Sequence, residues 1–235
     1  MRYAFLIPLL LVCPPAHAAE RRYFIADFDR IRIEGPLDVR LATRGAPAAT
    51  VTGVVPVGFE LHVDGTVLTV RATRSAGGVS TPSNTGAAPV VSLRTGDLHG
   101  VSVMGGGRLV IEGPVRGARI DLQILGSGAI TAPAIDGEQL GVTVVGTGAM
   151  TLGGRAARAR LFGNGTGTID ASALRVDALV LRLDGSGSAQ ASARYTADVV
   201  SSGLGAATVY GAPKCKVSTP GGAAVACGVP PPAAP

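Results

Sequence analysis

The sequence predicts an all-β protein: a single-stranded β-solenoid, of the right-handed parallel β-helix kind, with coils of about 20 residues. Three observations predict this fold. Gly-x-Gly tripeptides recur at nearly even intervals, aliphatic residues keep fixed positions relative to them, and the composition favours short strands with tight corners. The chain has 235 residues, of which 34 are glycine, and only 4% are aromatic. Small and β-branched residues punctuated by glycine are typical of such strands.

The repeat is measured from the second glycine of each Gly-x-Gly. Intervals of 21, 20, 19, 20 and 18 residues separate these glycines, which are Gly107, Gly128, Gly148, Gly167, Gly187 and Gly205. Six residues before them stand only branched aliphatic residues, namely Val101, Leu122, Val142, Leu161, Leu181 and Val199. The position two residues after each glycine is also apolar. This period-two patterning predicts strands with one buried face, stacked coil upon coil.

Glycine is expected at the corners because stacked backbones lie about 4.8 Å apart and glycine reaches positive φ without a Cβ clash. The predicted corner glycines are Gly126, Gly128, Gly146, Gly148, Gly165, Gly167, Gly185, Gly187, Gly203 and Gly205. Hydroxyl groups between them, as in Ser127 and Thr147, are expected to hydrogen-bond along the stack. A dinucleotide-binding loop is excluded because no helix pattern follows the glycines. A calcium-binding β-roll is not expected, because it would need Asp in every repeat and only Asp170 and Asp184 lie near corners.

The strand pattern continues before Gly107, although the period blurs. Residues 28–43 (FDRIRIEGPLDVRLAT) alternate around a Gly-Pro turn, and residues 59–73 (FELHVDGTVLTVRAT) predict a hairpin or tight corner at Asp64-Gly65. The stretch 75–88 is polar and predicts a loop. We expect one β-solenoid domain over residues 19–228, with 19–98 as first coils or cap and 99–228 as regular coils. Residues 229–235 are expected to form a disordered tail.

The chain begins with features of a Sec signal peptide at residues 1–18: a basic Arg2, an apolar run and the small residues Ala16 and Ala18. The apolar run is about half the roughly 20 residues that a membrane span needs, so no span is expected after signal removal. Lipoprotein processing at Cys13 is not expected, because Val12 before it is larger than the small residue that such processing needs. The protein is therefore expected to be exported and to be periplasmic, outer-surface or secreted.

Export affects how the cysteines are interpreted. Loss of Cys13 with the signal leaves Cys215 and Cys227, an even pair in an oxidising compartment. A disulfide between them is expected. The alternatives, a metal site or a nucleophile, lack neighbouring His, Asp or further Cys residues in the sequence.

Several of these segments resemble an exported bacterial family of unknown function, described as putative auto-transporter adhesin, head GIN domain. The matching stretches are FDRIRIEGPLDVRL, LHVDGTVLTVRA, the corners LGSGAI, VGTGAM and DGSGSA, and the closing ATVYGAPKCKVSTPGGA. The resemblance covers about residues 23–226. It implies a β-helical fold and a place in the bacterial envelope, and it brings no catalytic residues.

Candidate ligand-binding residues are few. Asn164 and Asp184 are consecutive in an outward-facing column, and Phe162 occupies another such column. Asn164 and Asp184 could instead hydrogen-bond to backbone at the corners, and Phe162 could cover neighbouring aliphatic residues rather than stack on a sugar. No metal ligand set or cofactor site is predicted. The formal charge of +5 is dispersed, which argues against a nucleic-acid partner.

The predicted function is a non-catalytic binding or adhesion module of the envelope or cell surface. It would present a repetitive β-helix face to an envelope polysaccharide or a surface protein. One alternative is a β-helix carbohydrate-active enzyme, either a polysaccharide lyase or a hydrolase. Another is a structural envelope component that self-associates through its stack ends. The sequence leaves the ligand and the oligomeric state open.

Overall fold

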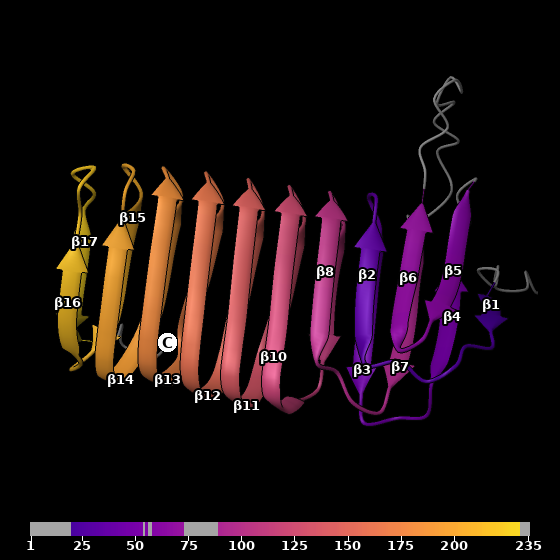
Figure 1. The fold of residues 1–235 in the computed structure, drawn as a ribbon. Coiled ribbons are helices and arrows are strands. Elements are labelled where there is room, and N and C mark those ends of the chain that lie inside the picture. Colours follow the sequence, from indigo (N-terminus) through magenta and orange to yellow (C-terminus); the bar gives the residue numbers. More distant parts are fainter. Residues whose placement is uncertain (1–19, 54, 56–57, 73–88, 231–235) are drawn as a thin grey trace, which may run out of the picture.

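The computed structural model describes residues 20–53, 55, 58–72 and 89–230, and every regular element within them is a β-strand. These strands stack into one elongated β-solenoid (Figure 1), so the predicted fold class is confirmed. The expected signal peptide with Cys13, the expected loop at 75–88 and most of the expected tail lie outside the described residues. The last strand reaches Val229, one residue into the stretch expected to be tail.

Long strands build the regular coils, and each runs through most of one turn. Parallel register places Ile120 beside Leu140, Leu140 beside Ala159, and Ala159 beside Leu179, which matches the predicted coil length. The strands of this region are β8 (Gly100–Gly105), β9 (Arg108–Glu112), β10 (Val115–Gly126), β11 (Ala129–Gly146), β12 (Ala149–Gly165), β13 (Thr168–Gly185), β14 (Ser188–Ser201) and β15 (Ala206–Gly211).

Each regular coil has three faces, which the strand register defines. The front face, toward the viewer in Figure 1, contains β8 and the last residues of β10 to β14. The back face contains β9, β15 and the first residues of β11 to β14. Between them lies the connecting face, formed by residues 115–119, 135–139, 154–158, 174–178 and 192–196. The Gly-x-Gly corners join the front face to the back face on the other side of the coil.

The core is one continuous column of aliphatic side chains. Leu122, Val142, Leu161 and Leu181, predicted to stack inside the coils, are each at most 2% exposed. The position two residues after each corner is equally buried, from Leu109 through Met150 to Ala207, and all these residues belong to a single cluster. Full burial of one such aliphatic side chain contributes about 1.5–3 kcal/mol. The stack is therefore stabilised by many equivalent contacts along its whole length.

The two glycines of each corner serve different purposes. At every corner except the last, at residues 203–205, the first takes positive φ, as at Gly126 (122°) and Gly165 (112°). The second does not, but a Cβ on Gly167 would lie 2.6 Å from the carbonyl oxygen of Gly148 in the previous coil. The first glycine therefore makes the turn, and the second permits the close approach of the backbones.

Backbone amides, rather than hydroxyl groups, connect the middle residues of successive corners. The amides of Ser127 and Thr147 donate to the carbonyl oxygens of Gly105 and Gly126 at 2.9 and 3.0 Å. Among the described corner residues, no hydroxyl of this column bonds to the next one, so the expected hydroxyl ladder is not formed. The amides take over because the corner geometry already points them along the stack.

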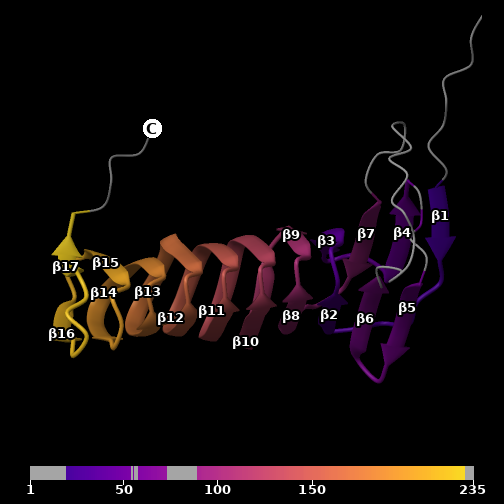
Figure 2. The ribbon, with the colours of Figure 1, turned by 90° about the horizontal axis from the view of Figure 1, so that it is seen from above.

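The amino-terminal strands do not stack in sequence order (Figure 2). Strands β2 (Arg30–Glu34) and β3 (Asp38–Thr43) form a coil that lies between the later strands β6 and β7 on one side and β8 and β9 on the other. Antiparallel strands then cover the end: β5 on β6, β4 on β7, and β1 on β4. The predicted hairpin at Asp64-Gly65 is the β5–β6 pair and is confirmed. The bounds are β1 (Glu20–Tyr23), β4 (Ala48–Thr52), β5 (Phe59–Asp64), β6 (Val67–Ala72) and β7 (Val90–Thr95).

The carboxy-terminal end is closed by a disulfide. Strand β16 (Lys214–Ser218) adds to the front face and β17 (Val225–Val229) to the back face. Cys215 lies beside Ala197 and Cys227 beside Val209, both residues of the buried columns. The predicted Cys215–Cys227 bond is confirmed, with a Cα–Cα distance of 6.3 Å. It joins the two faces where no further coil covers the core.

Gly167→Ala is expected to lower the free energy of unfolding by at least about 2 kcal/mol, because the new methyl group would meet backbone of the previous coil. Gly96→Ala is the matched control, since a Cβ there meets nothing within 4 Å and its φ is not positive. Its effect should stay within about 0.5 kcal/mol. Denaturant unfolding measures both values. Equal losses for the two variants would contradict the close-approach role of the second corner glycine.

The double variant Cys215→Ser and Cys227→Ser is expected to loosen β16 and β17, because the bond constrains a short loop and a disulfide typically contributes about 2–4 kcal/mol. Hydrogen exchange followed by mass spectrometry should show faster exchange in β16 and β17 and unchanged exchange in β10 to β13. The reduced wild-type protein serves as a control and should behave like the variant. Unaltered exchange in β16 and β17 would show that the bond does not hold this end.

Candidate functional site

A groove of about 750 Å³ runs along the connecting face from β11 to β15. Its floor is a column of small or medium-sized residues that are consecutive in register: Gly137, Ala156, Val176, Ala193 and Gly211. The three side chains in the middle of this column point inward and are buried. Because these side chains point inward, only backbone faces outward along this column, and the surface stays low between the outward-pointing residues on either side. Coil stacking then turns this local depression into a continuous groove.

Two ridges flank the floor. The residues just before the floor column form one ridge, which contains Asp136, Arg155, Arg175 and Ser192 in consecutive coils. The residues just after it form the other ridge, which contains Glu138, Ala157, Asp177 and Arg194. The groove is therefore lined by three arginines and a single aspartate, Asp177, with Asp136 and Glu138 at its edge.

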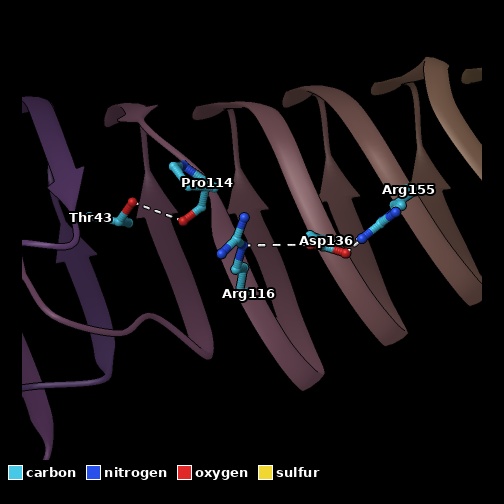
Figure 3. A network of polar contacts seen from close by, with 5 residues as sticks. All are labelled: Thr43, Pro114, Arg116, Asp136 and Arg155. Atoms are coloured by element: carbon cyan, nitrogen blue, oxygen red, sulfur yellow. Dashed lines mark hydrogen bonds and ion pairs between the residues drawn. The ribbon is translucent and has the colours of Figure 1, made fainter.

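Asp136 lies between two arginines of neighbouring coils, as Figure 3 shows. Arg155 donates two hydrogen bonds to its carboxylate, from Nε to Oδ1 at 2.7 Å and from Nη2 to Oδ2 at 3.2 Å. Arg116 Nε lies 3.5 Å from Oδ2. The hydrogen bond from Arg155, helped by the charges of Arg155 and Arg116, holds the pKa of Asp136 below its ordinary value. The same bond raises the pKa of Arg155, whose charge is thus already engaged.

Local irregularities in the strands position the groove residues. Gly154, at φ 108°, brings β12 so close under β11 that a Cβ would overlap the carbonyl oxygen of Ile135, and Arg155 follows it directly. Three extra residues, 172–174, interrupt the register before Arg175. Asp170 fixes this insertion by accepting hydrogen bonds from the amide (3.1 Å) and hydroxyl (2.6 Å) of Ser172.

A separate contact joins the amino-terminal coil to the start of the connecting face. The Thr43 hydroxyl donates to the Pro114 carbonyl at 2.9 Å (Figure 3).

A β-bulge presents Arg194. Register passes from Val176 beside Ala193 to Ala178 beside Thr196, so Arg194 and Tyr195 together oppose Asp177. Bulges re-aim side chains and are common next to functional sites. The Arg194 guanidinium lies 4.7 Å from the centre of the Tyr195 ring, which is half exposed. Among the described residues, no carboxylate lies within ion-pairing distance of Arg175 or Arg194.

The residues singled out from the sequence lie elsewhere, on the front face. Asn164 is beside Asp184 in register, and Phe162 is beside Arg182 and half buried. Asp184 accepts a hydrogen bond from the Ser202 hydroxyl of the next coil. The hollow next to Asn164 and Asp184 measures only about 10 Å³, about the room that one water needs. A ligand role for Asn164, Asp184 and Phe162 stays a prediction.

The sequence pattern did not predict the ridge that contains Asp136, Arg155 and Arg175, because its distance from the preceding corner varies from coil to coil. Arg116, Asp136, Arg155 and Arg175 stand nine, eight, seven and eight residues after their corner glycines, and Ser192 only five. Register shifts at Ala132/Ile135, Thr151/Gly153 and Ala171/Arg175 absorb these differences. A glycine-based alignment therefore separates residues that the structure places side by side. The repeated Arg-x-x-Arg of 116–119 and 155–158 was the available signal.

Two other kinds of site are absent from the part of the chain that the structure describes. No three His, Cys, Asp or Glu residues come together there as ligands for a metal ion. No helix there is both long and apolar enough to cross a membrane.

Arg155→Gln is expected to raise the pKa of Asp136 toward its ordinary value, because the variant loses the hydrogen bond and charge that favour the carboxylate. The ion pair is intact above the ordinary carboxyl range and is lost as the pH falls through the lowered pKa. NMR titration of the Asp136 side chain measures the shift. Arg160→Gln, at an exposed arginine of the front face, should leave it unchanged. An Asp136 titration that Arg155→Gln does not move would contradict the bridge.

Solved structures similar to this one share its fold across most of their length. A putative adhesin from Bacteroides fragilis aligns with a TM-score of 0.73 and 21% identity, over 92% of this chain and 96% of its own. A putative adhesin from Parabacteroides distasonis gives 0.71 and 16%, over 90% and 97%. A protein from the same species described as a putative lipid binding protein gives 0.67 and 19%, over 90% and 96%. At these identities the likeness concerns the fold alone.

No curated protein matches the chain. Residues 27–213 match the family described as "Putative auto-transporter adhesin, head GIN domain". This match covers the inserted coil β2–β3, all regular coils and the long groove. It agrees with the resemblance seen in the sequence motifs. The chain belongs to the head GIN domain family of putative auto-transporter adhesins.

Proposed function

We propose that this protein is an exported, non-catalytic binding or adhesion module of the cell envelope or cell surface. It presents an outer side of its stack to a glycan or a protein. The family description as an adhesin supports a binding role, and the groove on the connecting face supplies a surface for it.

The groove is the observation that carries this proposal. It crosses several coils, and Arg175 and Arg194 extend beside it without carboxylate partners among the described residues. The surrounding backbone is held by continuous ladders between long strands. A preformed surface of this kind loses little conformational freedom when a ligand binds, so more of the contact energy appears as affinity.

Export is supported from two sides. The disulfide Cys215–Cys227 is typical of proteins from oxidising compartments. The basic start, apolar run and small residues of positions 1–18 fit a Sec signal peptide. The protein would then act in the periplasm, at the outer surface or after secretion.

Binding is favoured over polysaccharide cleavage by the acids near the groove. Most glycosidases use two carboxyl groups that flank the scissile bond. Asp177 is the one acid among the described residues that line the groove itself. Asp136 and Glu138 lie at its edge, and Asp136 is engaged by Arg155 and Arg116. Asp184, on the front face, is bonded to Ser202 and faces a hollow too small for a sugar.

A glycan and surface-protein array, probed with the purified protein, tests the proposal. We expect retention on at least one glycan or protein and no shortening of any bound polysaccharide, as followed by size-exclusion chromatography. The Asp184→Ala variant is the control for catalysis, and because the proposed binding surface is the groove on the connecting face, away from Asp184, it should bind like the wild type. Depolymerisation that Asp184→Ala abolishes would replace the binding module with an enzyme, and an array without any retained partner would contradict the binding role.

A further inference from the structure

We propose that the groove on the connecting face binds an acidic polysaccharide lengthwise, with anionic groups of successive sugars against Arg175 and Arg194. This inference rests on the proposed binding function and names the ligand class of that function. Its basis is the charge of the groove, the shape of its floor and the contrast with the other large hollow of the molecule.

Charge gathers on this part of the connecting face. The segments 154–158, 174–178 and 192–196 contain four arginines and one aspartate, while the whole chain carries a formal charge of +5. Segment 135–139, at the end of the groove, adds Asp136 and Glu138. Arg155 is engaged by Asp136, but Arg175 and Arg194 have no such partner among the described residues. Carboxylates and sulfates are the groups that guanidinium binds in paired, charge-assisted hydrogen bonds. A ligand with such groups would supply the missing counter-charges.

Another large hollow of the described residues has most of its arginines paired with acids. It measures about 640 Å³ and lies over β1, β3, β4, β7 and the end of β9. Two of its three arginines pair with acids: Arg22 lies 3.1 Å from Glu20 of the same strand, and Arg40 lies 4.0 Å from Glu112 of a neighbouring strand. The third, Arg94, has no ion-pair partner among the described residues. Charge there is largely compensated within the protein. The groove beside Arg175 and Arg194 differs by leaving its positive charge for a ligand.

The shape of the groove favours a polymer over a small ion or a flat bilayer. The floor of Gly, Ala and Val residues runs along the stack between two ridges, so a ligand chain can lie in it and cover several coils. Successive coils are about 4.8 Å apart, close to the length of one sugar residue in an extended polysaccharide. Anionic groups on neighbouring sugars can therefore meet arginines on neighbouring coils. A lipid surface, being flat, would touch the ridges without filling the floor.

The test compares two double variants of the purified full chain. Polygalacturonate is the acidic probe and dextran the neutral one, and binding is measured by biolayer interferometry at low and high salt. We expect polygalacturonate to bind, and its binding to weaken at high salt. Dextran should bind much more weakly. Arg175→Gln with Arg194→Gln should weaken binding of polygalacturonate by about tenfold or more. Arg160→Gln with Arg182→Gln removes two exposed arginines of the front face and should change it less than about twofold.

Ala157→Glu provides a second, independent variant. Ala157 is exposed and lines the groove, so the new carboxylate should repel the polymer without disturbing the core. Thermal unfolding checks that all variants keep the wild-type fold. An equal loss of polygalacturonate binding in both arginine double variants would overturn the proposal that the groove binds an acidic polysaccharide. Binding that Ala157→Glu does not weaken would overturn it as well.

Further outcomes separate this inference from the proposed function. Retention of dextran or a surface protein, together with unchanged binding by the Arg175→Gln and Arg194→Gln variant, would leave a binding module but overturn its ligand class. Preference for phosphatidylglycerol vesicles over polygalacturonate would likewise overturn it, in favour of a lipid headgroup. Absence of binding to every probe and every array partner would contradict both.

Discussion

The spacing of successive coils, about 4.8 Å in a β-sheet, is the constraint on which the other features of this molecule depend. At the corners this spacing brings carbonyl oxygens of one coil under the α-carbons of the next. A Cβ on Gly128 or Gly148 would lie 2.7 or 2.8 Å from the oxygen below it. Only glycine fits such a position without shifting backbone. Since each corner keeps a continuous register with the front-face strand before it, a coil displaced at its corner would also move its aliphatic residues out of the core.

Common register has opposite consequences on the two sides of the backbone. Inside, it stacks equivalent aliphatic residues, so that Leu161 and Leu181 belong to one dry column. Outside, it stacks whatever the sequence supplies, because packing imposes little there. On the connecting face this produces a row of charged residues, Arg116, Asp136, Arg155 and Arg175, beside a floor of small residues. The groove is thus a by-product of the same ladder that builds the core.

A stack of coils has two ends, and each exposes backbone groups that could pair with another chain. The two ends are closed in different ways. Antiparallel strands β1, β4 and β5 cover the amino-terminal end, where the first coil in sequence has been placed beneath later strands. A covalent bond between Cys215 and Cys227 holds the other end, where the last strands have no coil beyond them. Regular repetition cannot supply these ends, so both depart from the repeat.

The sequence by itself determined the solenoid, the length of its coils, the buried columns and the disulfide, because local patterns encode all of them. Periodic glycines predict corners, and periodic aliphatic residues such as Leu122 and Val142 predict buried positions, whichever strand lies next to them. Only the tertiary structure decided the position of coil β2–β3 and the assembly of the groove. Stack order depends on which strand edges meet in space, and the row of Arg155 and Arg175 depends on insertions that change the residue count per coil. Neither the stack order nor this row of arginines therefore corresponds to a constant spacing in the sequence.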